Sequence, residues 1–325
     1  MKDYLLQTCV RLHFNYADLP FSAQRDESVA RRATDRITAA LERAGDTYAY
    51  YLPHALNAET RRRLTEKGLL HPDTFAAPYS VLYLRMDEAL SVQTALGDHA
   101  VIAAYDESDI QAALERASAV RTGLSETGIP ARDEEYGYLT AHPCHAGEGM
   151  TVQALLHLPM LRMTGQSDKA NAALSQKNVI LRPFGGVQAK IPGGMYILEN
   201  RACMGKDAGE YINEVMQSAK ILTAVEERFR TTAREKADES VYDAVWRALG
   251  VAKYARKITI PDARHLWSML TLGAAIDAFE MDEEALSDLW ELACGKAPCD
   301  QEENQLQNVD MLRAQRVRFL LNGGN

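Results

Sequence analysis

The sequence predicts an α+β fold in which an antiparallel sheet flanked by helices is followed by a small all-helical domain. Alternating, β-rich segments are mixed with helical periodicity as far as about residue 238, whereas the pattern from 239 onward is helical throughout. Strands mixed with helices, and then helices alone, are typical of this class. The predicted domains are residues 1–238, with a short helical N-terminal part to about 75 and the sheet after it, and residues 239–325.

Composition narrows the function classes. With 46% hydrophobic and 25% charged residues, the chain of 325 residues is typical of globular proteins. The net charge of −9 argues against nucleic acid or an anionic membrane as a partner. No apolar run reaches the length of a membrane span, and the first residues lack the apolar core of a secretory leader. Five scattered cysteines suit a reducing compartment, so we expect a cytoplasmic protein.

The first elements are an extended start over residues 1–20, which ends in a proline turn, and two helices. Apolar residues recur at helical spacing over 22–44, opposite arginines and glutamates. The second helix, over 58–67, carries three consecutive arginines at 61–63. Such a run can bind phosphate, but it is more typical of a solvated helix face.

Residues 80–105 alternate between apolar and polar types and predict consecutive antiparallel strands with two tight turns. A helix over 106–125 follows, because apolar residues then return at helical spacing. Asp106 or Ser108 is the expected N-cap of this helix.

The stretch 135–161 predicts a short strand over 136–140, a loop rich in His, Pro, Cys and Gly, and then an apolar helix. A loop that delivers the chain to a helix start presents side chains and free N–H groups to a ligand. The remaining pattern predicts further strands and helices in this order: strands over 179–182 and 195–200, a helix over 207–236, and C-terminal helices broken near 250, 261, 282 and 295–298.

Residues 135–161, EYGYLTAHPCHAGEGMTVQALLHLPML, closely resemble the signature GYLT-x-CPTN-x-GTG-x-RASV-x-LHLP of the ATP:guanido phosphotransferases. This family contains arginine and creatine kinases and bacterial protein arginine kinases. Residues 181–205 resemble a second family segment, and LTEKGLLHP at 64–72 resembles a stretch of the protein arginine kinases. VDMLRA at 309–314 resembles their regulatory phosphoarginine motif RD-x-x-RA. The resemblance implies a phosphagen-kinase-like sheet and a helical dimerisation or regulatory domain at 239–325.

Phosphoryl transfer to a guanidinium needs cations on the nucleotide phosphates and carboxylates on the guanidinium. By the resemblance, five arginines cradle the phosphates of MgATP in the family. Arg11 keeps one of these positions. Other residues take the remaining four, namely Cys9, Val101, Thr151 and Gly185. The chain also begins close to Cys9, so we expect one edge of the nucleotide site to be incomplete.

The family's catalytic positions are altered as well. Leu96 and Gly97 replace two glutamates, and Lys190 replaces a third with the opposite charge. Asp98 and His99 are retained from the same motif. His142 takes the place of the family cysteine, and Cys144 stands next to it. No residue is therefore assigned a catalytic role, and each missing charged group is expected to cost on the order of 10²–10³ in rate.

The favoured hypothesis is a pseudokinase, a catalytically impaired regulatory or adaptor protein. The resemblance implies a homodimer, or a heterodimer with an active protein arginine kinase homologue, and protease or adaptor proteins as further partners. ATP and Mg²⁺ are implied as cofactors by the resemblance alone.

Two alternatives stay open. An active phosphotransferase with a rebuilt site would use cationic side chains on the phosphates and Asp98 as the base; the candidate cations are Arg11, Arg182, Lys190 and Lys206. A metal or thiol site would use the loop residues His142, Cys144 and His145, with Cys9 and His99 facing the same cleft by resemblance. The spacing H-x-C-H matches no strong zinc pattern, so no metal is assigned.

The C-terminal motif needs its own interpretation. Asp310 and Arg313 match the phosphoarginine motif, whereas Val309 replaces its first arginine. Losing one of two guanidinium forks weakens a phosphate pocket. The alternative is that Asp310 and Arg313, three residues apart, form an ion pair on a helix surface.

Overall fold

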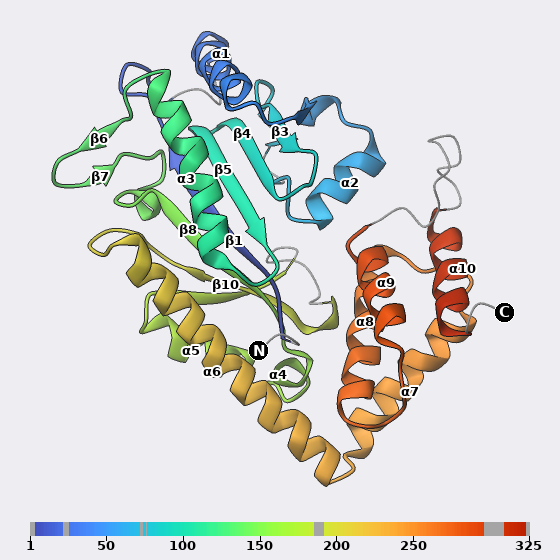
Figure 1. Cartoon of the computed structure of the whole chain (residues 1–325). Coiled ribbons are helices and arrows are strands. Elements are labelled where there is room, and N and C mark those ends of the chain that lie inside the picture. The colour runs from blue at the N-terminus through green and yellow to red at the C-terminus, as the bar shows by residue number, and fades with distance from the viewer. Residues whose placement is uncertain are drawn as a thin grey trace. The chain divides into compact units, whose positions relative to one another are not determined.

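The computed structural model of the chain describes residues 4–21, 26–71, 74–75, 77–184, 192–295 and 309–322. Its main element is an eight-stranded sheet with the spatial order β2-β3-β4-β5-β1-β8-β10-β9 (Figure 1). These strands are β1 (Leu5–Phe14), β2 (Tyr48–Tyr51), β3 (Leu82–Arg85), β4 (Leu90–Leu96), β5 (Asp98–Asp106), β8 (Met150–His157), β9 (Val179–Pro183) and β10 (Met195–Asn200). A second, two-stranded sheet pairs β6 (Arg132–Asp133) with β7 (Gly137–Tyr138). The α+β class is confirmed.

Among the residues that the structure describes, helices occur where the sequence predicts them over 22–44, 58–67, 106–125 and 207–236, whereas the helix Ser167–Ser175 was not predicted. The helices are α1 (Glu27–Ala44), α2 (Ala58–Glu66), α3 (Ile110–Glu126), α4 (Pro159–Met163), α5 (Ser167–Ser175), α6 (Ala208–Glu235), α7 (Glu239–Tyr254), α8 (Ile260–Ala275), α9 (Glu283–Ala293) and α10 (Val309–Leu321). Single 3₁₀ turns are η1 (Pro53–Ala55), η3 (Pro143–His145) and η4 (Pro192–Gly194). The helix predicted over 207–236 and the strands predicted over 179–182 and 195–200 are confirmed.

Contacts divide the chain into two compact units. The first contains residues 1–156, 171–181 and 197–219, and the second contains 157–170, 182–196 and 220–325. Segments before residue 238 thus pack with the C-terminal helices, so contacts do not follow chain order alone. The boundary between 238 and 239 stays a prediction about domains.

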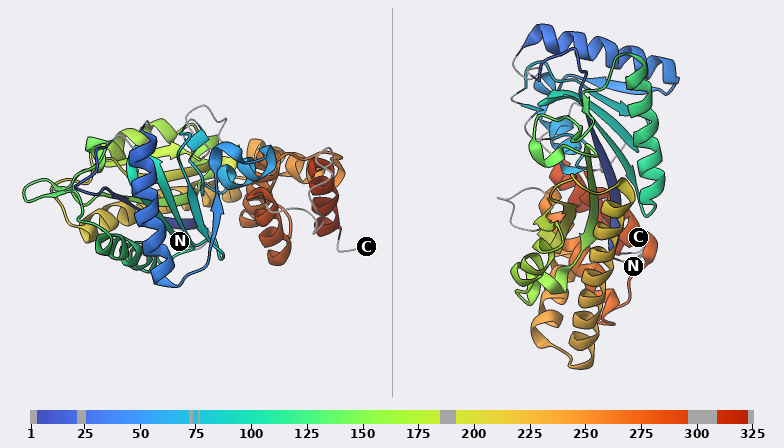
Figure 2. Two further views of the ribbon diagram at one scale, coloured as in Figure 1. Left: turned by 90° about the horizontal axis from the view of Figure 1, so that it is seen from above. Right: turned by 90° about the vertical axis from the view of Figure 1, so that its left-hand side faces the viewer.

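In the first unit, helices α1 and α3 cover one face of the sheet (Figures 1 and 2). Val10, Leu12 and Phe14 alternate along β1 and are fully buried on this side. Alternation with period 2 places every second side chain of a strand on the same face. The buried stripe of α1, which includes Ala33 and Ile37, supplies the opposing apolar surface.

The other face of the sheet lies under α2 and the segment that follows it. Leu64 of α2 belongs to a core cluster with Leu69 and Leu70, which pack against side chains of the sheet. The strand residues of this cluster are Cys9, Leu82, Leu84, Ala103 and Tyr105. These apolar contacts show which part of this sheet face α2 and the segment after it cover.

The apolar stretch after residue 149 is a strand, and the predicted helix is wrong here. All eight residues of β8 are buried, and β8 lies between β1 and β10. A central strand covered on both faces loses its alternation, so a continuous apolar run does not distinguish it from a buried helix. The helical part is confined to α4, which begins at Pro159.

Two further details differ from the prediction. Asp109 caps α3, since its carboxylate accepts the N–H groups of Gln111 and Ala112, whereas Asp106 accepts those of Ser108 and Asp109 in the preceding turn. Gly250 does not break α7, which continues to Tyr254. A glycine inside a helix costs only about 1 kcal/mol relative to alanine, and packing outweighs it.

The second unit holds a buried polar network. Glu226 of α6 accepts the N–H groups of Met160 and Leu161 at the start of α4, and Arg230 donates to the same carboxylate at 3.0 Å. His157 bonds to Ser268 of α8 at 2.7 Å and lies 3.5 Å from Arg230. These contacts tie α4, α6 and α8 together in this unit.

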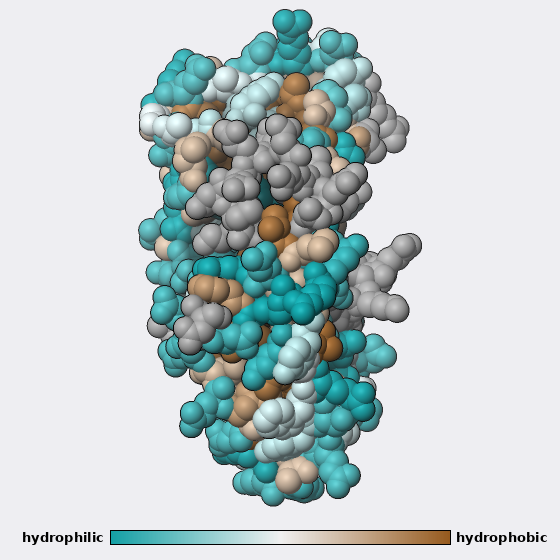
Figure 3. Space-filling view, turned by 90° about the vertical axis from the view of Figure 1, so that its right-hand side faces the viewer, coloured by the Kyte–Doolittle hydropathy of each residue, from teal (hydrophilic) through white to brown (hydrophobic). Residues whose placement is uncertain are grey.

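On the face in Figure 3, hydrophobic residues form small patches separated by hydrophilic ones. Among the described helices, none combines the length and apolarity that crossing a bilayer requires.

Candidate functional site

The positions that the family uses for phosphate arginines meet on one face of the sheet. Arg11 of β1 pairs with Thr151 of β8 on one side and with Ala103 of β5 on the other. Val101 precedes Ala103 by two residues on β5, and Cys9 precedes Arg11 by two residues on β1. Directly opposed residues and residues two apart share a face. Strand register therefore gathers Cys9, Arg11, Val101 and Thr151 side by side.

Arg11 is the single cation among these four positions, and its guanidinium is already engaged. It donates to the carbonyl of Gly68 at 3.4 Å, and the hydroxyl of Tyr105 donates to the same carbonyl at 3.1 Å. Gln93 donates to the carbonyl of Leu69 at 3.1 Å. The segment after α2 thus lies over this part of the sheet face and is bonded to it.

Cys9 and Glu199 are also neighbours of Arg11, and neither group attracts phosphate. Burial raises the pKa of the Cys9 thiol to about 11, although Arg11 beside it acts in the opposite direction. The thiol is therefore neutral at physiological pH. Glu199 of β10 accepts from Gln153 of β8 at 2.5 Å, and its charge acts on both Cys9 and Arg11. A carboxylate beside Arg11 offsets the positive charge that a nucleotide would need.

Asp98 is buried at the start of β5, where hydrogen bonds hold its carboxylate in place. One oxygen accepts from Asn15 at 2.6 Å and from the N–H of Ala141 at 2.7 Å, and the other lies 2.9 Å from Nδ1 of His13. Burial alone would raise the pKa of Asp98, but the hydrogen bond and charge of His13 and the other donors hold it below the ordinary value. A carboxylate bonded in this way is a poor base.

His99 does not face the sheet site, so the cleft position expected from the resemblance is wrong. Its Nδ1 accepts the N–H of Tyr16 at 3.0 Å, and its Nε2 lies 2.9 Å from the carbonyl of Pro20. The ring is buried and lies near the rings of Tyr16 and Phe21. His99 holds the turn after β1 in place, because both ring nitrogens are used there.

Leu96 and Gly97 form the tight connection between β4 and β5, where Leu96 pairs with Asp98. Gly97 has a φ of 89°, a conformation that favours glycine. A Cβ at this position would lie 3.7 Å from Nε2 of His142. The positions of the two lost glutamates are therefore next to the loop that carries His142.

In the loop between β7 and β8, His142 and Cys144 are exposed and His145 is half-buried. The ring of His145 stacks on that of His13 with 3.8 Å between centroids, and the His142 ring centroid is 6.0 Å away. Burial, and then the neighbouring His13, lower the pKa of His145 to about 4. The loop thus brings His145, rather than Cys144, to the sheet.

Cys203 and Gly147 fix this loop. The thiol of Cys203 donates to the carbonyl of His145 at 2.9 Å, and burial raises its pKa. Gly147 exchanges backbone hydrogen bonds with Tyr138, and a Cβ on Gly147 would meet the carbonyl oxygen of Cys203 at 2.1 Å. Only glycine permits so close an approach.

The other predicted site residues lie apart from this face or outside the description. Gly185 and Lys190 fall outside the described residues. Lys206 forms an ion pair with Glu214, so its charge is paired locally. Arg182 lies on β9 and is half-buried.

In the C-terminal motif, Asp310 and Arg313 form the ion pair at i, i+3, with Arg313 buried and Asp310 partly exposed. The guanidinium of Arg313 is almost fully buried, donating to Asp310 at 2.7 Å and to the carbonyl of Ile258 at 2.8 Å. The N–H of Ile258 donates to the carbonyl of Asp310 at 3.0 Å. Both residues attach α10 to the segment before α8. Phosphoarginine recognition by this motif stays a prediction.

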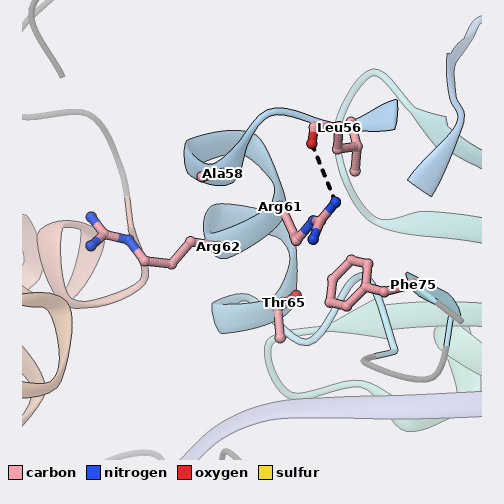
Figure 4. A pocket seen from close by; sticks show the side chains of 6 residues that line it. All are labelled: Leu56, Ala58, Arg61, Arg62, Thr65 and Phe75. Atoms are coloured by element: carbon pink, nitrogen blue, oxygen red, sulfur yellow. Dashed lines mark hydrogen bonds between the residues drawn. The ribbon is translucent and has the colours of Figure 1, made fainter. Parts of the chain in front are cut away.

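The arginine run of α2 borders a cavity of about 380 Å³ (Figure 4). Arg61 lies over the ring of Phe75 at 4.5 Å and points toward Leu56, whereas Arg62 points away from them. Arg63 forms an ion pair with Glu88 at 2.6 Å. The solvated helix face expected from the sequence is confined to Arg62, which is exposed.

Comparison with known proteins tests the resemblance. Residues 29–229 match the family model of the ATP:guanido phosphotransferase C-terminal catalytic domain. Residues 238–324 match the model of the protein-arginine kinase McsB C-terminal domain. The chain belongs to the ATP:guanido phosphotransferase family. The two matches together cover residues 29–229 and 238–324 of the chain.

Relatives of this ATP:guanido phosphotransferase match it over most of their length. The chain is 28% identical to a protein-arginine kinase of Symbiobacterium thermophilum, over 98% of this chain and 93% of the relative. It is also 28% identical to that of Moorella thermoacetica, over 99% and 95%. These relatives are protein-arginine kinases by name, and the chain is similar to them over nearly its whole length.

Solved structures show the same fold. Lombricine kinase superposes with a TM-score of 0.60 and 18% identity, covering 73% of this chain and 68% of the kinase. The duplicated taurocyamine kinase of Schistosoma mansoni superposes with a TM-score of 0.60 and 18% identity, covering 69% of this chain and 33% of that longer chain. The phosphagen-kinase-like sheet predicted from the sequence is confirmed.

Sequence reasoning missed His13 and Glu199. His13 follows Arg11 by two residues in a predicted extended segment, so alternation would have placed it on the same face. Glu199 lies on a strand that was predicted, but no local signal indicates that β10 is a neighbour of β8.

Proposed function

We propose that this family member is a catalytically impaired pseudokinase that acts as a regulatory or adaptor protein in the cytoplasm. The observation that carries the proposal is the sheet face around Arg11. Of the family's phosphate positions in the described part of the chain, three have lost their charge, and the guanidinium of Arg11 donates to Gly68. Each lost cation is expected to cost on the order of 10²–10³ in rate, although such losses are not additive.

The residues present do not fit a bound MgATP. A triphosphate needs several cations aimed at one place, whereas Arg11 here lies beside Glu199 and under the segment after α2.

An active phosphotransferase with a rebuilt site is the competing hypothesis. Its proposed base, Asp98, is fully engaged by His13, Asn15 and Ala141, and Lys206 pairs with Glu214. Both contacts weaken the rebuilt-site hypothesis, because neither charge is directed at a substrate.

The helical region supports association as the remaining activity. Exposed apolar side chains occur on α7 and α10, which contact each other. They are Trp246, Val251, Tyr254, Met311 and Phe319, with exposed fractions of 49–77%. We propose a homodimer, or a heterodimer with an active protein arginine kinase homologue, through these helices, and protease or adaptor proteins as further partners.

Calorimetry with ATP and ADP, with and without Mg²⁺, tests the proposal. The protein-arginine kinase of Moorella thermoacetica, prepared in parallel, is the positive control. We expect no heat of binding at millimolar nucleotide and no phosphoarginine on a protein substrate. Magnesium-dependent binding together with phosphoarginine formation would establish the active alternative instead.

Light scattering of the full chain tests the association. We expect a dimer, alone or with the homologue, that Trp246→Glu or Tyr254→Glu dissociates, while Met86→Glu, at an exposed site on the β3–β4 turn, leaves it intact. A monomer that also fails to bind the homologue would remove the regulatory hypothesis.

A further inference from the structure

We propose that His13, Asp98 and His145 form a binding site for a divalent transition-metal ion such as Zn²⁺. The three residues come from β1, the start of β5 and η3, and each offers one ligand atom within 4.8 Å of the other two. Two imidazoles and one carboxylate are a donor set that suits zinc and related ions. The inference does not depend on whether nucleotide binds.

The spacing of the donors fits coordination. Nδ1 of His13 lies 2.9 Å from Oδ2 of Asp98. Metal bonds of about 2.0–2.2 Å place neighbouring ligand atoms roughly 3 Å apart, so one ion can be bound by both of these atoms. His145 lies over His13 with an angle of 19° between the rings. In this arrangement the ligand atom of His145 lies within 4.8 Å of those of His13 and Asp98.

The unsatisfied nitrogen of His145 points to a missing ligand. Its Nδ1 is buried and has no hydrogen-bond partner among the residues that the structure describes. A buried polar atom left without a partner costs about 1–3 kcal/mol, so such atoms are rare. Coordination by an ion supplies the partner that the fold does not.

The surrounding contacts hold the donors in place. Asn15 and the N–H of Ala141 orient one oxygen of Asp98 and leave the other free to face His13. The thiol of Cys203 holds the carbonyl of His145. Outer hydrogen bonds of this kind orient ligands in metal sites. Because three protein ligands leave a coordination position for water, the site resembles open rather than closed zinc sites.

The proposed ligands differ from the loop residues His142, Cys144 and His145 that the sequence suggested for a metal site. His142 and Cys144 are exposed, and the His142 ring is 6.0 Å from His145 at an angle of 80°. His13 was not among those loop residues, but its ring stacks on His145 and bonds to Asp98. The proposed ion is therefore bound by His13 of β1, by Asp98 at the start of β5 and by His145 of the loop.

Metal titration tests the site. The full chain is freed of metal with a chelator and titrated with Zn²⁺, and with Co²⁺ as a visible-absorption probe. We expect one equivalent of either ion to bind and the Co²⁺ bands to appear. His145→Ala and His13→Gln should each weaken binding by at least about tenfold, whereas His142→Ala, Cys144→Ser and the exposed His54→Ala should stay within about threefold.

Circular dichroism of each metal-free variant separates a lost ligand from a lost fold. His13→Gln alters the sheet and His145→Ala the loop, so a folding defect in one leaves the other as a test. Failure of the wild type to take up one equivalent would overturn the site. So would wild-type affinity in a folded His145→Ala, or loss of affinity in His142→Ala or Cys144→Ser alone.

Discussion

Cys9 and Cys144 show how position sets the chemistry of one residue type. Cys9 lies within the core cluster under α2, and burial raises its pKa to about 11. Cys144 is exposed on the loop after β7. Since the thiolate is the reactive form and needs access, the two thiols should differ strongly in reactivity.

Thiol labelling measures this difference. Iodoacetamide should modify Cys144 of the native protein readily and leave Cys9 and Cys203 unmodified until the chain unfolds, because both have raised pKa values and are buried. Peptide mass spectrometry identifies the labelled residues, and Cys144→Ser removes the fast label from the peptide that carries position 144. Rapid labelling of Cys9 in folded protein would contradict its place in the core.

At the scale of elements, β8 illustrates why burial outweighs local pattern. Its eight residues are all buried between neighbouring strands, although the sequence fits a helix equally well. Leu156 at its end pairs with Leu5 of β1 and is fully buried.

Leu156→Ala should lower the free energy of unfolding by about 2–5 kcal/mol, because it removes buried methyl groups and leaves a cavity. Urea denaturation measures this change. Met86→Ala, at a site 67% exposed, is the matched control and should change it by less than about 0.5 kcal/mol. Equal effects of the two substitutions would mean that β8 is not central to the core.

The start of α3 provides a second test at this scale. Asp109→Ala removes the acceptor for two backbone N–H groups and should cost about 0.5–2 kcal/mol in urea denaturation. Ser108→Ala, one residue earlier, should be nearly neutral. The reverse order would return the cap to the residue that the sequence suggested.

At the scale of the whole molecule, buried titratable groups make global stability depend on pH. Burial, and then the charge of Arg230, lower the pKa of His157 well below its ordinary value of 6.5. Burial raises the pKa of Glu226 in the same network. Since the unfolded chain protonates His157 near pH 6.5 and the native state does not, stability from this group is complete above that pH and is lost as the pH falls.

The free energy of unfolding should therefore fall by up to about 1.4 kcal/mol per pH unit from His157 below about pH 6.5. Glu226 acts in the opposite direction, since the native state takes up its proton first as the pH falls. The slope difference between wild type and His157→Gln, from urea denaturation across this range, isolates the histidine. Parallel slopes would show that His157 is protonated in the native state.

The sequence by itself determined most elements, the family and the loss of charge. Period-2 and period-3.6 patterns located β3–β5, α1 and α6. An element that is buried on one face has apolar residues at the spacing of that face, so the sequence shows its period. Motif positions showed directly that Cys9, Val101 and Thr151 are not arginines. These properties are local or follow from the resemblance to the family's motifs, so no contact information was needed.

Only the tertiary structure decided the identity of β8, the engagement of Arg11 by Gly68, and the meeting of His13, Asp98 and His145. A strand buried on both faces has no period to read. The other features join residues far apart in sequence, and strand order and loop contacts decide which of them meet. Position within the sheet also decides the protonation of Cys9 and Asp98, because burial and hydrogen bonds arise only when the chain folds.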